Sequence, residues 1–497
     1  MVGVPGRSNG CQTCRKRRLK CADEARPRCQ RCEKSGYKCA GYEKPLHFRI
    51  AVSSATEATK ISRTATTLHC RNNSHSAVPM TLSLVSFESD ICNAFLLENF
   101  VWRSYGYKWL HLAVSGKISL LALQASSALS QSNFGSFHRQ YDLKINGSIL
   151  YGKVVRSLIP VLSYPIKPAV EALIVPIMIL LIHESLLADQ TGSISHVRGL
   201  IQLIMVCGPE RFQQEPLRSA FESCRATLIT IGLISKKRCF PDEEKWHSIP
   251  WAIEPSSKSP QNYLADILVT VPGMLEDDAV LRRQYDSMAR ATLIDRLKCQ
   301  LIKLFEWRWN WEKLNQFSVW EVPVSLNPNR PAITGQDRIF ESIFCFSAFE
   351  LATEIMLYNG VQMWLVGLLQ ELLPLNSPAI ISSAARISAS RAGTLRDTNF
   401  TPLVLPGTSF SLREPAIEIC RALEYQCLNL QHSRGAALFC LLPIGLAYGT
   451  LEQEPQYRDW IRSMLDLSPV MKGYVLGQSV KGFGLYYRYW RLPGITA

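Results

Sequence analysis

The sequence predicts a chain of two unlike parts, a small cysteine-rich domain at the N-terminus and a large all-α helical domain after it. Three observations support this division. Six of the 16 cysteines fall within the first 39 of the 497 residues. The same segment holds most of the net positive charge. The rest of the chain places apolar residues at helical spacing, and no β-alternating series with hairpin turns competes with that pattern.

The N-terminal cysteines form a repeated pattern. Their spacing is C-x2-C-x6-C-x7-C-x2-C-x6-C, which is one eleven-residue unit written twice at an offset of 18. The first copy reads CQTCRKRRLKC, the second reads CQRCEKSGYKC, and six of the eleven positions are identical. The residues concerned are Cys11, Cys14, Cys21, Cys29, Cys32 and Cys39. Such a repeat implies a pseudo-two-fold arrangement of ligands around a shared centre.

The number of thiols indicates what this centre is. A closed structural zinc site has four ligands, so two separate sites would need eight. Only six cysteines are present, and the nearest histidine, His47, lies outside the repeat. Either two cysteines each bridge two metal ions, or a single ion is bound. The repeat favours two structural zinc ions, with Cys11 and Cys29, the first cysteine of each copy, as the bridging ligands.

Disulfides and an iron–sulfur site are the alternative interpretations. A disulfide framework requires an oxidising compartment, and the sequence MVGVPGRSNG at the N-terminus contains no apolar segment typical of a signal peptide. Iron–sulfur sites usually show tighter spacing, such as C-x2-C-x2-C. Unrelated structural cysteines would not repeat in register. The spacing therefore predicts a zinc cluster.

The first copy of the repeat also carries a basic loop. Between Cys14 and Cys21 the chain reads RKRRLK, with a net charge of +5, whereas the matching EKSGYK of the second copy carries +1. Residues 1–50 contain 13 Lys and Arg against 4 Asp and Glu, which is +9 of the chain's +14. A solvated face or a nuclear localisation signal alone would also give a basic run. Held rigid by a metal cluster, however, this run is typical of a nucleic-acid contact.

These features together resemble the fungal binuclear zinc-cluster transcription factors. The resemblance rests on the cysteine spacing, on RKRRLK in the first loop, on Pro27 between the copies and on AGYEKPLHF after Cys39. It implies two zinc ions wrapped by a short helix and an extended strand from each copy. It also implies a nuclear protein that regulates RNA polymerase II genes by binding double-stranded DNA at a CGG-like half-site.

The resemblance assigns roles to the basic residues of the first loop. It places Arg17 and Arg18 where the triplet is read, and an arginine can pair bidentately with guanine O6 and N7. It places Arg15, Lys16 and Lys20 where phosphate contacts are expected, which supply affinity rather than sequence choice.

The chain is expected to divide into three segments: the cluster domain over residues 8–42, a flexible linker over 43–84 and the helical domain over 85–497. Ser and Thr are frequent over 53–76 and no aromatic residue occurs there, which is typical of a linker. Residues 40–80 show no sustained heptad pattern, so no coiled coil is expected there and the oligomeric state stays open.

The helical domain is predicted from several amphipathic segments, among them 87–102, with Asp90 as an N-cap, and 149–162, ending near Pro160. A longer helical stretch is expected over 338–373. The segment 172–182 is strongly apolar, but a membrane span needs about 20 apolar residues, so we expect a buried helix. The order of these segments resembles the regulatory region of the same family, which implies an all-helical regulatory domain but does not say what that domain binds. Transcription co-regulators are the expected partners, and no membrane association is expected.

No complete catalytic motif is visible, so the sequence predicts no enzyme. His183-Glu184 is half of a metalloprotease motif, but Leu187 stands where the second histidine is needed, and the pair is expected at a polar helix end. Trp307, Trp309 and Trp311 are expected to pack in a core. Two alternative functions remain: a catalytic domain recruited to DNA, and a zinc module that binds nucleic acid or protein without sequence choice.

Overall fold

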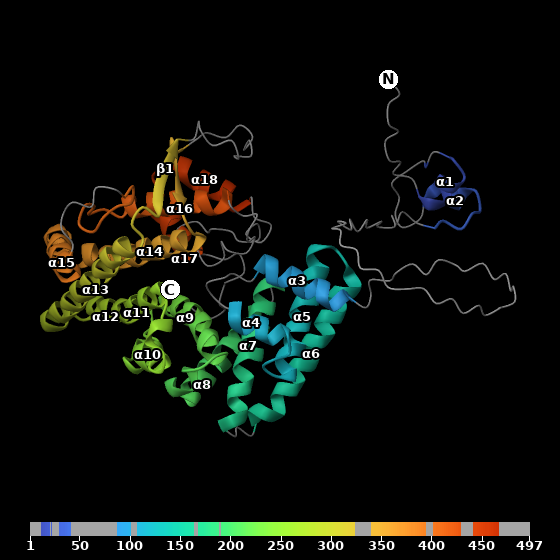
Figure 1. Cartoon of the computed structure of the whole chain (residues 1–497), viewed down its shortest axis with the longest axis horizontal. Helices are drawn as coiled ribbons and strands as arrows, with labels where there is room; N and C mark the ends of the chain where they lie inside the picture. The colour runs from blue at the N-terminus through green and yellow to red at the C-terminus, as the bar shows by residue number, and fades with distance from the viewer. Residues whose placement is uncertain are drawn as a thin grey trace, which may run out of the picture. The chain divides into compact units, whose positions relative to one another are not determined.

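The computed structural model divides into two compact units, Met1–Met80 and Thr81–Ala497, whose elements are labelled in Figure 1. The residues that it describes are 11–19, 21, 29–40, 87–100, 107–163, 167–187, 190–323, 339–393, 401–428 and 441–466. The predicted linker over 43–84 lies outside the described residues. The first unit contains one cluster of buried side chains, and the second contains two.

The described part of the N-terminal unit contains one short helix in each copy of the cysteine repeat. Helix α1 spans Gln12–Lys16 and helix α2 spans Gln30–Lys34. Each begins directly after the first cysteine of its copy. Among the described residues of this unit, the buried cluster consists of cysteines alone. Because no aliphatic side chain joins that cluster, the fold of these residues depends on what the cysteines hold.

Helices dominate the described part of the second unit, as the sequence predicts. Its α-helices are α3 (Glu88–Phe100), α4 (Tyr107–Val114), α5 (Leu120–Phe137), α6 (Tyr141–Ser163), α7 (Lys167–Leu187), α8 (Gln190–Cys207), α9 (Leu217–Ser235), α10 (Lys245–Ser248), α11 (Pro260–Leu268), α12 (Val271–Arg283), α13 (Ser287–Leu314), α14 (Phe349–Leu372), α15 (Ser377–Ala392), α16 (Arg413–Leu428), α17 (Leu441–Thr450) and α18 (Pro455–Asp466). Short 3-10 turns are η2 (Pro209–Phe212), η3 (Phe240–Asp242), η4 (Ile249–Trp251) and η5 (Pro255–Ser257).

One hydrophobic core lies among α3 to α9, with α7 at its centre. Every residue from 173 to 181 is buried, because α7 packs against α5, α6, α8 and α9 and so has apolar neighbours on all sides. The predicted buried helix over 172–182 is therefore confirmed. Among the described helices, none is both long enough and apolar enough to cross a membrane.

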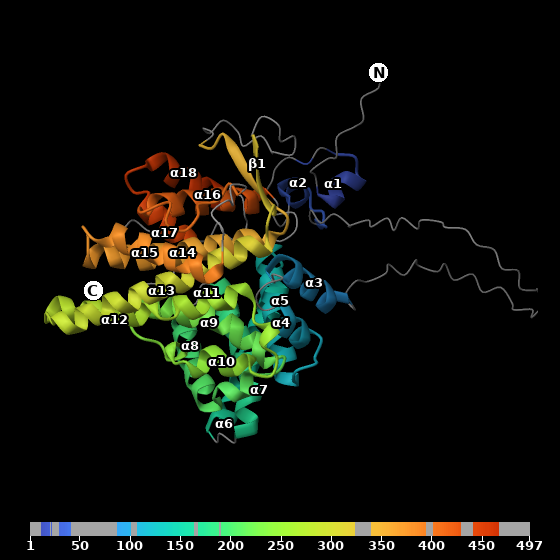
Figure 2. The ribbon, with the colours of Figure 1, turned by 60° about the vertical axis from the view of Figure 1, so that its left-hand side comes forward.

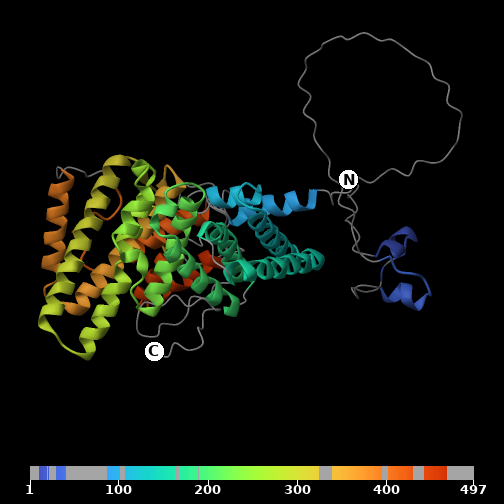
Figure 3. The same cartoon turned by 90° about the horizontal axis from the view of Figure 1, so that it is seen from below.

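Helices α5 and α6 approach each other closely at Gly147. A Cβ atom at Gly147 would lie 2.6 Å from the backbone nitrogen of Ser132, so only glycine fits there. Figure 3 shows these two helices side by side.

A second core surrounds α14, which Figure 2 shows between α13 and the pair α16 and α17. Trp311 is buried in this core, its ring centroid 6.4 Å from that of Trp307, which in turn stacks on Tyr358 at 5.8 Å. Trp309 donates from its indole nitrogen to Ser388 of α15 at 3.2 Å. The prediction that these tryptophans pack in a core is confirmed for Trp307 and Trp311, whereas Trp309 is half-buried outside the core.

The second unit also contains a pair of short strands that the sequence analysis missed. β1 (Val319–Pro323) pairs antiparallel with β2 (Ser342–Phe346), with Glu321 opposite Phe344. The helix predicted over 338–373 is therefore wrong in its first third, and α14 begins only at residue 349. The sequence SIFCF suits a strand because its β-branched and aromatic side chains pack on a pleated surface, and this strand contacts α16.

One predicted helix end is wrong, because α3 already begins at Glu88 and Asp90 is therefore not its N-cap. Helix α6 ends at Ser163, close to the predicted end near Pro160, but it begins at Tyr141, well before the predicted segment 149–162. A proline removes one backbone hydrogen bond, and so close to the helix end that loss affects only the last turns.

His183 and Glu184 lie near the C-terminal end of α7 and are buried among α5, α6 and α8. His183 Nε2 is 3.1 Å from Ser132 Oγ, and its ring stacks on Tyr151 at 4.6 Å. The Tyr151 hydroxyl donates to Glu184 and lies 3.0 Å from Nε2 of His196. Burial lowers the pKa of His183 to about 4. The cluster is a polar junction between helices.

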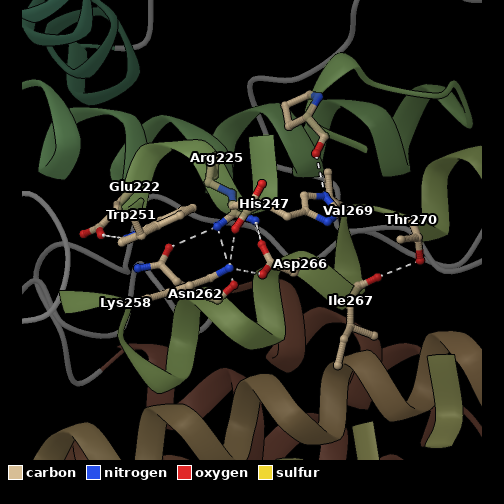
Figure 4. Close-up of polar contacts among 12 residues, drawn as sticks. Glu222, Arg225, His247, Trp251, Lys258, Asn262, Asp266, Ile267, Val269 and Thr270 are labelled. Carbon is tan, nitrogen blue, oxygen red and sulfur yellow. Dashed lines mark hydrogen bonds and ion pairs between the residues drawn. The ribbon is translucent and has the colours of Figure 1, made fainter. Parts of the chain in front are cut away.

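Helix α9 belongs to both cores, and a buried polar network surrounds its middle (Figure 4). The guanidinium of Arg225, 1% exposed, pairs with Asp266 of α11 and donates to Asn262 Oδ1 at 3.2 Å. Lys258 pairs with the same carboxylate. The ring of Trp251 lies 5.3 Å from the Arg225 guanidinium carbon and 4.6 Å from Lys258 Nζ. One carboxylate and one indole thus hold two cations.

Candidate metal cluster and nucleic-acid interface

In each copy of the repeat, the first cysteine caps the helix that follows it. Cys29 has extended backbone angles, and its Sγ accepts a hydrogen bond from the backbone N–H of Cys32 at 3.3 Å. In the first copy the N–H of Cys14 donates to Cys11 Sγ at the same distance, 3.3 Å. A sulfur thus takes the place that Ser or Asp usually occupies at a helix start. Both caps orient the sulfur toward the next cysteine.

The third cysteine of each copy is held by the first. The backbone N–H of Cys11 donates to Cys21 Sγ at 3.5 Å, and that of Cys29 donates to Cys39 Sγ at 3.4 Å. The helix cap and the bond to the third cysteine of the first copy therefore both recur at the matching positions of the second. The pseudo-two-fold arrangement inferred from the sequence is present in the backbone as well.

The sulfur atoms are spaced as ligands of a metal rather than as disulfides. Cys11 Sγ lies 3.5 Å from Cys29 Sγ and 3.8 Å from Cys32 Sγ. Cys14 Sγ lies 3.7 Å from Cys29 Sγ. A disulfide would require about 2.05 Å. Four thiolates at about 2.3 Å from a tetrahedral zinc ion stand about 3.8 Å apart, which fits the observed spacing.

The cysteines fall into two groups of four, and within each group all sulfurs lie within 4.8 Å of one another. One group is Cys11, Cys14, Cys21 and Cys29, and the other is Cys11, Cys29, Cys32 and Cys39. Cys11 and Cys29 are common to both groups. This is the arrangement that two bridging and four terminal thiolates require.

Burial makes these thiols poor acids on their own. It raises the pKa of Cys11 and Cys14, and it raises the pKa of Cys32 to about 12. At neutral pH such thiols would stay protonated unless a cation took the proton's place. A soft dication suits sulfur donors and would compensate the charge of the thiolates. The donor set therefore fits zinc.

The basic loop of the first copy lies on the surface of the unit. Lys16, Arg17 and Arg18 are exposed. Arg15 belongs to α1, but its side chain, like all of Lys20, lies outside the described residues. The structure thus leaves three of the five predicted DNA contacts open to a partner.

Arg17 and Arg18, both predicted to read bases, differ in their surroundings. The guanidinium carbon of Arg17 lies 3.6 Å from the ring centroid of Tyr37, a residue of the second copy. This cation–π contact holds Arg17 against the body of the unit. The role of Tyr37 was not predicted from the sequence, although Tyr37 is the aromatic residue of the second loop, EKSGYK.

Arg18 has a left-handed backbone with φ of 53°. Gly36, its counterpart in the second copy, has φ of 69°, and in both copies the next residue donates back to a cysteine carbonyl at 2.9 Å. Glycine adopts this conformation readily, whereas other residues pay roughly 1 kcal/mol. The first copy thus keeps an arginine side chain where the backbone favours glycine.

Thr13 joins the two copies. Its hydroxyl donates to the carbonyl of Lys38 at 3.2 Å and accepts from the N–H of Ala40 at 2.9 Å. The role of Thr13 was not predicted from the sequence. The one indication is that Arg31 occupies the equivalent position of the second copy, so the repeat is broken there. The geometry as a whole defines a small domain built around a thiolate metal cluster, with a basic loop on its surface.

Residues 9–47 match the model of the fungal Zn(2)-Cys(6) binuclear cluster domain. No curated protein and no solved structure matches the chain. The chain therefore carries a fungal zinc-cluster domain at its N-terminus, as the cysteine spacing predicts, and a mostly helical remainder. Proteins with this domain are DNA-binding transcription regulators.

Proposed function

We propose that this protein is a zinc-dependent, sequence-specific transcription factor that regulates RNA polymerase II genes in the nucleus. The observation that carries the proposal is the arrangement of six cysteines in two groups of four that share Cys11 and Cys29. A metal cluster at these groups would hold the exposed basic loop in a fixed position. A rigid basic loop can enter the major groove in one register, which a flexible one cannot. We expect it to read a CGG-like triplet.

The zinc ions have a structural role in this proposal. Two ions are held by Cys11, Cys14, Cys21, Cys29, Cys32 and Cys39, with Cys11 and Cys29 bridging. Because thiolates fill every coordination position, the metal supplies folding free energy and not Lewis-acid chemistry.

The DNA contacts divide by side chain. Arg18 is exposed and held at a left-handed turn, which supports a role in reading guanine. Arg17 is assigned to the triplet as well, presented on the Tyr37 ring. Arg15, Lys16 and Lys20 are assigned to phosphates.

The rest of the chain is assigned to regulation. We propose a DNA-binding domain over residues 8–42, a connecting segment over 43–84 and a helical regulatory domain over 85–497 that contacts co-regulators. The helical domain contains two large hydrophobic cores and buried polar junctions, which is the content of a domain that folds independently.

Fluorescence anisotropy with the zinc-loaded full chain tests the proposal. The duplexes carry one CGG triplet, two CGG triplets at varied spacing, or a scrambled triplet. Binding is measured at about 0.15 M salt, the physiological ionic strength. We expect chelator-sensitive binding at least tenfold tighter to CGG duplexes, in line with the cost of about 1–3 kcal/mol per wrong base. Equal affinity for all duplexes would instead favour a module that binds nucleic acid without sequence choice.

A further inference from the structure

A cavity of about 710 Å³ lies in the helical unit, between the end of α9 and helices α12, α13 and α14. Its volume is within the range of about 300–1,000 Å³ typical of small-molecule sites. Trp364 and Leu368 of α14, both buried, and Leu275 of α12 line it with apolar surface. Tyr285 stands at its edge, 73% exposed. The aromatic or aliphatic part of a ligand could pack against these apolar side chains.

The charged groups of the cavity do not balance. Arg282 donates from Nε to Asp278 at 2.7 Å and also pairs with Glu371, so two carboxylates hold one guanidinium. Two further cations, Lys236 and Arg290, line the same cavity. Three cations against two carboxylates leave a net charge of +1.

Neither of these further cations is neutralised by a carboxylate in the part of the chain that the structure describes. Arg290 donates to the backbone carbonyl of Leu372, a neutral acceptor at the end of α14. Lys236 is exposed at the end of α9, and no ion pair with a described residue involves it. Both cations are thus positioned to receive an anionic group.

From this combination we infer that the cavity binds a small amphipathic monoanion, an aromatic acid with one carboxylate or sulfonate. The ring system lies against Trp364 and Leu368, and the anionic group reaches Lys236 and Arg290. A polyanion is disfavoured, because Asp278 and Glu371 also face the cavity. The inference rests on the helical unit alone and is independent of the proposed DNA binding.

The test uses two fluorescent probes with a nearly identical aromatic body. One is 1-anilinonaphthalene-8-sulfonate, an anion, and the other is N-phenyl-1-naphthylamine, which lacks the sulfonate. Both are titrated into the full chain at 0.15 M salt, a rough physiological value. We expect saturable binding of the anion, about three- to tenfold tighter than that of the neutral probe, as one partly screened charge contact would give.

Two charge variants locate the site. Lys236→Gln and Arg290→Gln should each weaken binding of the anion by about three- to tenfold and leave the neutral probe unchanged. The matched controls are Lys153→Gln and Arg156→Gln on α6, where Lys153 is exposed and Arg156, like Arg290, donates to a backbone carbonyl. The controls should bind both probes as the parent does.

Two further variants separate binding from folding. Lys236→Gly suits the left-handed φ of 50°, so the helix end keeps its stability while anion binding falls. Ala279→Trp fills the cavity and should abolish binding of both probes. Unchanged binding in Lys236→Gly and Ala279→Trp, equal affinity for the two probes, or no saturable binding at all would each overturn the inference.

Discussion

Asp266 holds together the polar network at the middle of α9, and its replacement by asparagine is expected to destabilise the helical unit. Its carboxylate pairs with Arg225, whose side chain is 1% exposed, and with Lys258, whose side chain is 9% exposed. Asparagine keeps the shape and one acceptor oxygen but removes the negative charge. Two cations would then remain close together with little water to screen them.

The expected loss follows from this burial. Breaking a buried ion pair by removing one partner costs about 3–5 kcal/mol, because an uncompensated charge stays behind. Asp266 itself is 16% exposed, and the Trp251 ring still covers both cations, so we expect the lower end of that range. The predicted decrease in the free energy of unfolding is about 3 kcal/mol.

Urea unfolding at pH 7, followed by circular dichroism, measures this decrease. Glu276→Gln is the control, because its partner Lys237 is 70% exposed and such a surface pair contributes about 0–1 kcal/mol. Adding Lys258→Met to Asp266→Asn should recover part of the loss by removing one of the two stranded cations. A decrease for Asp266→Asn no larger than that of Glu276→Gln would refute the reasoning.

Three further predictions follow from other sites. Arg18→Gly should stabilise the zinc cluster by up to about 1 kcal/mol, since φ is 53°, and yet lose preference for CGG; thermal melting and anisotropy read the two effects separately. Cys14→Ala should lower the zinc content of the purified full chain below two ions per molecule by mass spectrometry, and a retained content of two would contradict the ligand assignment. Burial raises the pKa of Glu354 from 4.5 to about 7, so the folded state holds the proton more tightly and the contribution of Glu354 to the free energy of unfolding falls by up to about 3 kcal/mol as pH rises from 4.5 to 7. Because His183 and Glu418 also have shifted pKa values, the quantity to measure by urea unfolding is the difference between the parent and Glu354→Gln, and a difference that does not change with pH would refute the assignment.

The sequence predicts the metal cluster better than its surroundings, for a physical reason. Ligand number and spacing are local properties, so the cysteine repeat alone predicts the shared centre and its two-fold character. The contact of Arg17 with Tyr37 joins the first copy to the second. The left-handed backbone at Arg18 is a conformation that arginine rarely adopts. Both depend on how the copies pack, which no pattern within one copy contains.

The same distinction applies to the helical unit. Apolar periodicity predicts α7 and most other helices, because their buried faces recur along the chain. It does not predict β1 and β2, since SIFCF is a short apolar segment that suits a helix or a strand until a partner strand is known. It also gives no indication that His183 and Glu184 meet Tyr151, because these residues come from different helices.

The membership of α9 in both cores has a consequence for how the helical unit behaves mechanically. Ala220, Phe221, Cys224 and Leu228 are packed in the core around α7, and Ile229 and Leu233 are packed in the core around α14. A rigid helix shared by two cores transmits displacement from one core to the other. The two halves should therefore melt in a single cooperative transition, and cutting the chain within α9 should leave neither half able to fold alone.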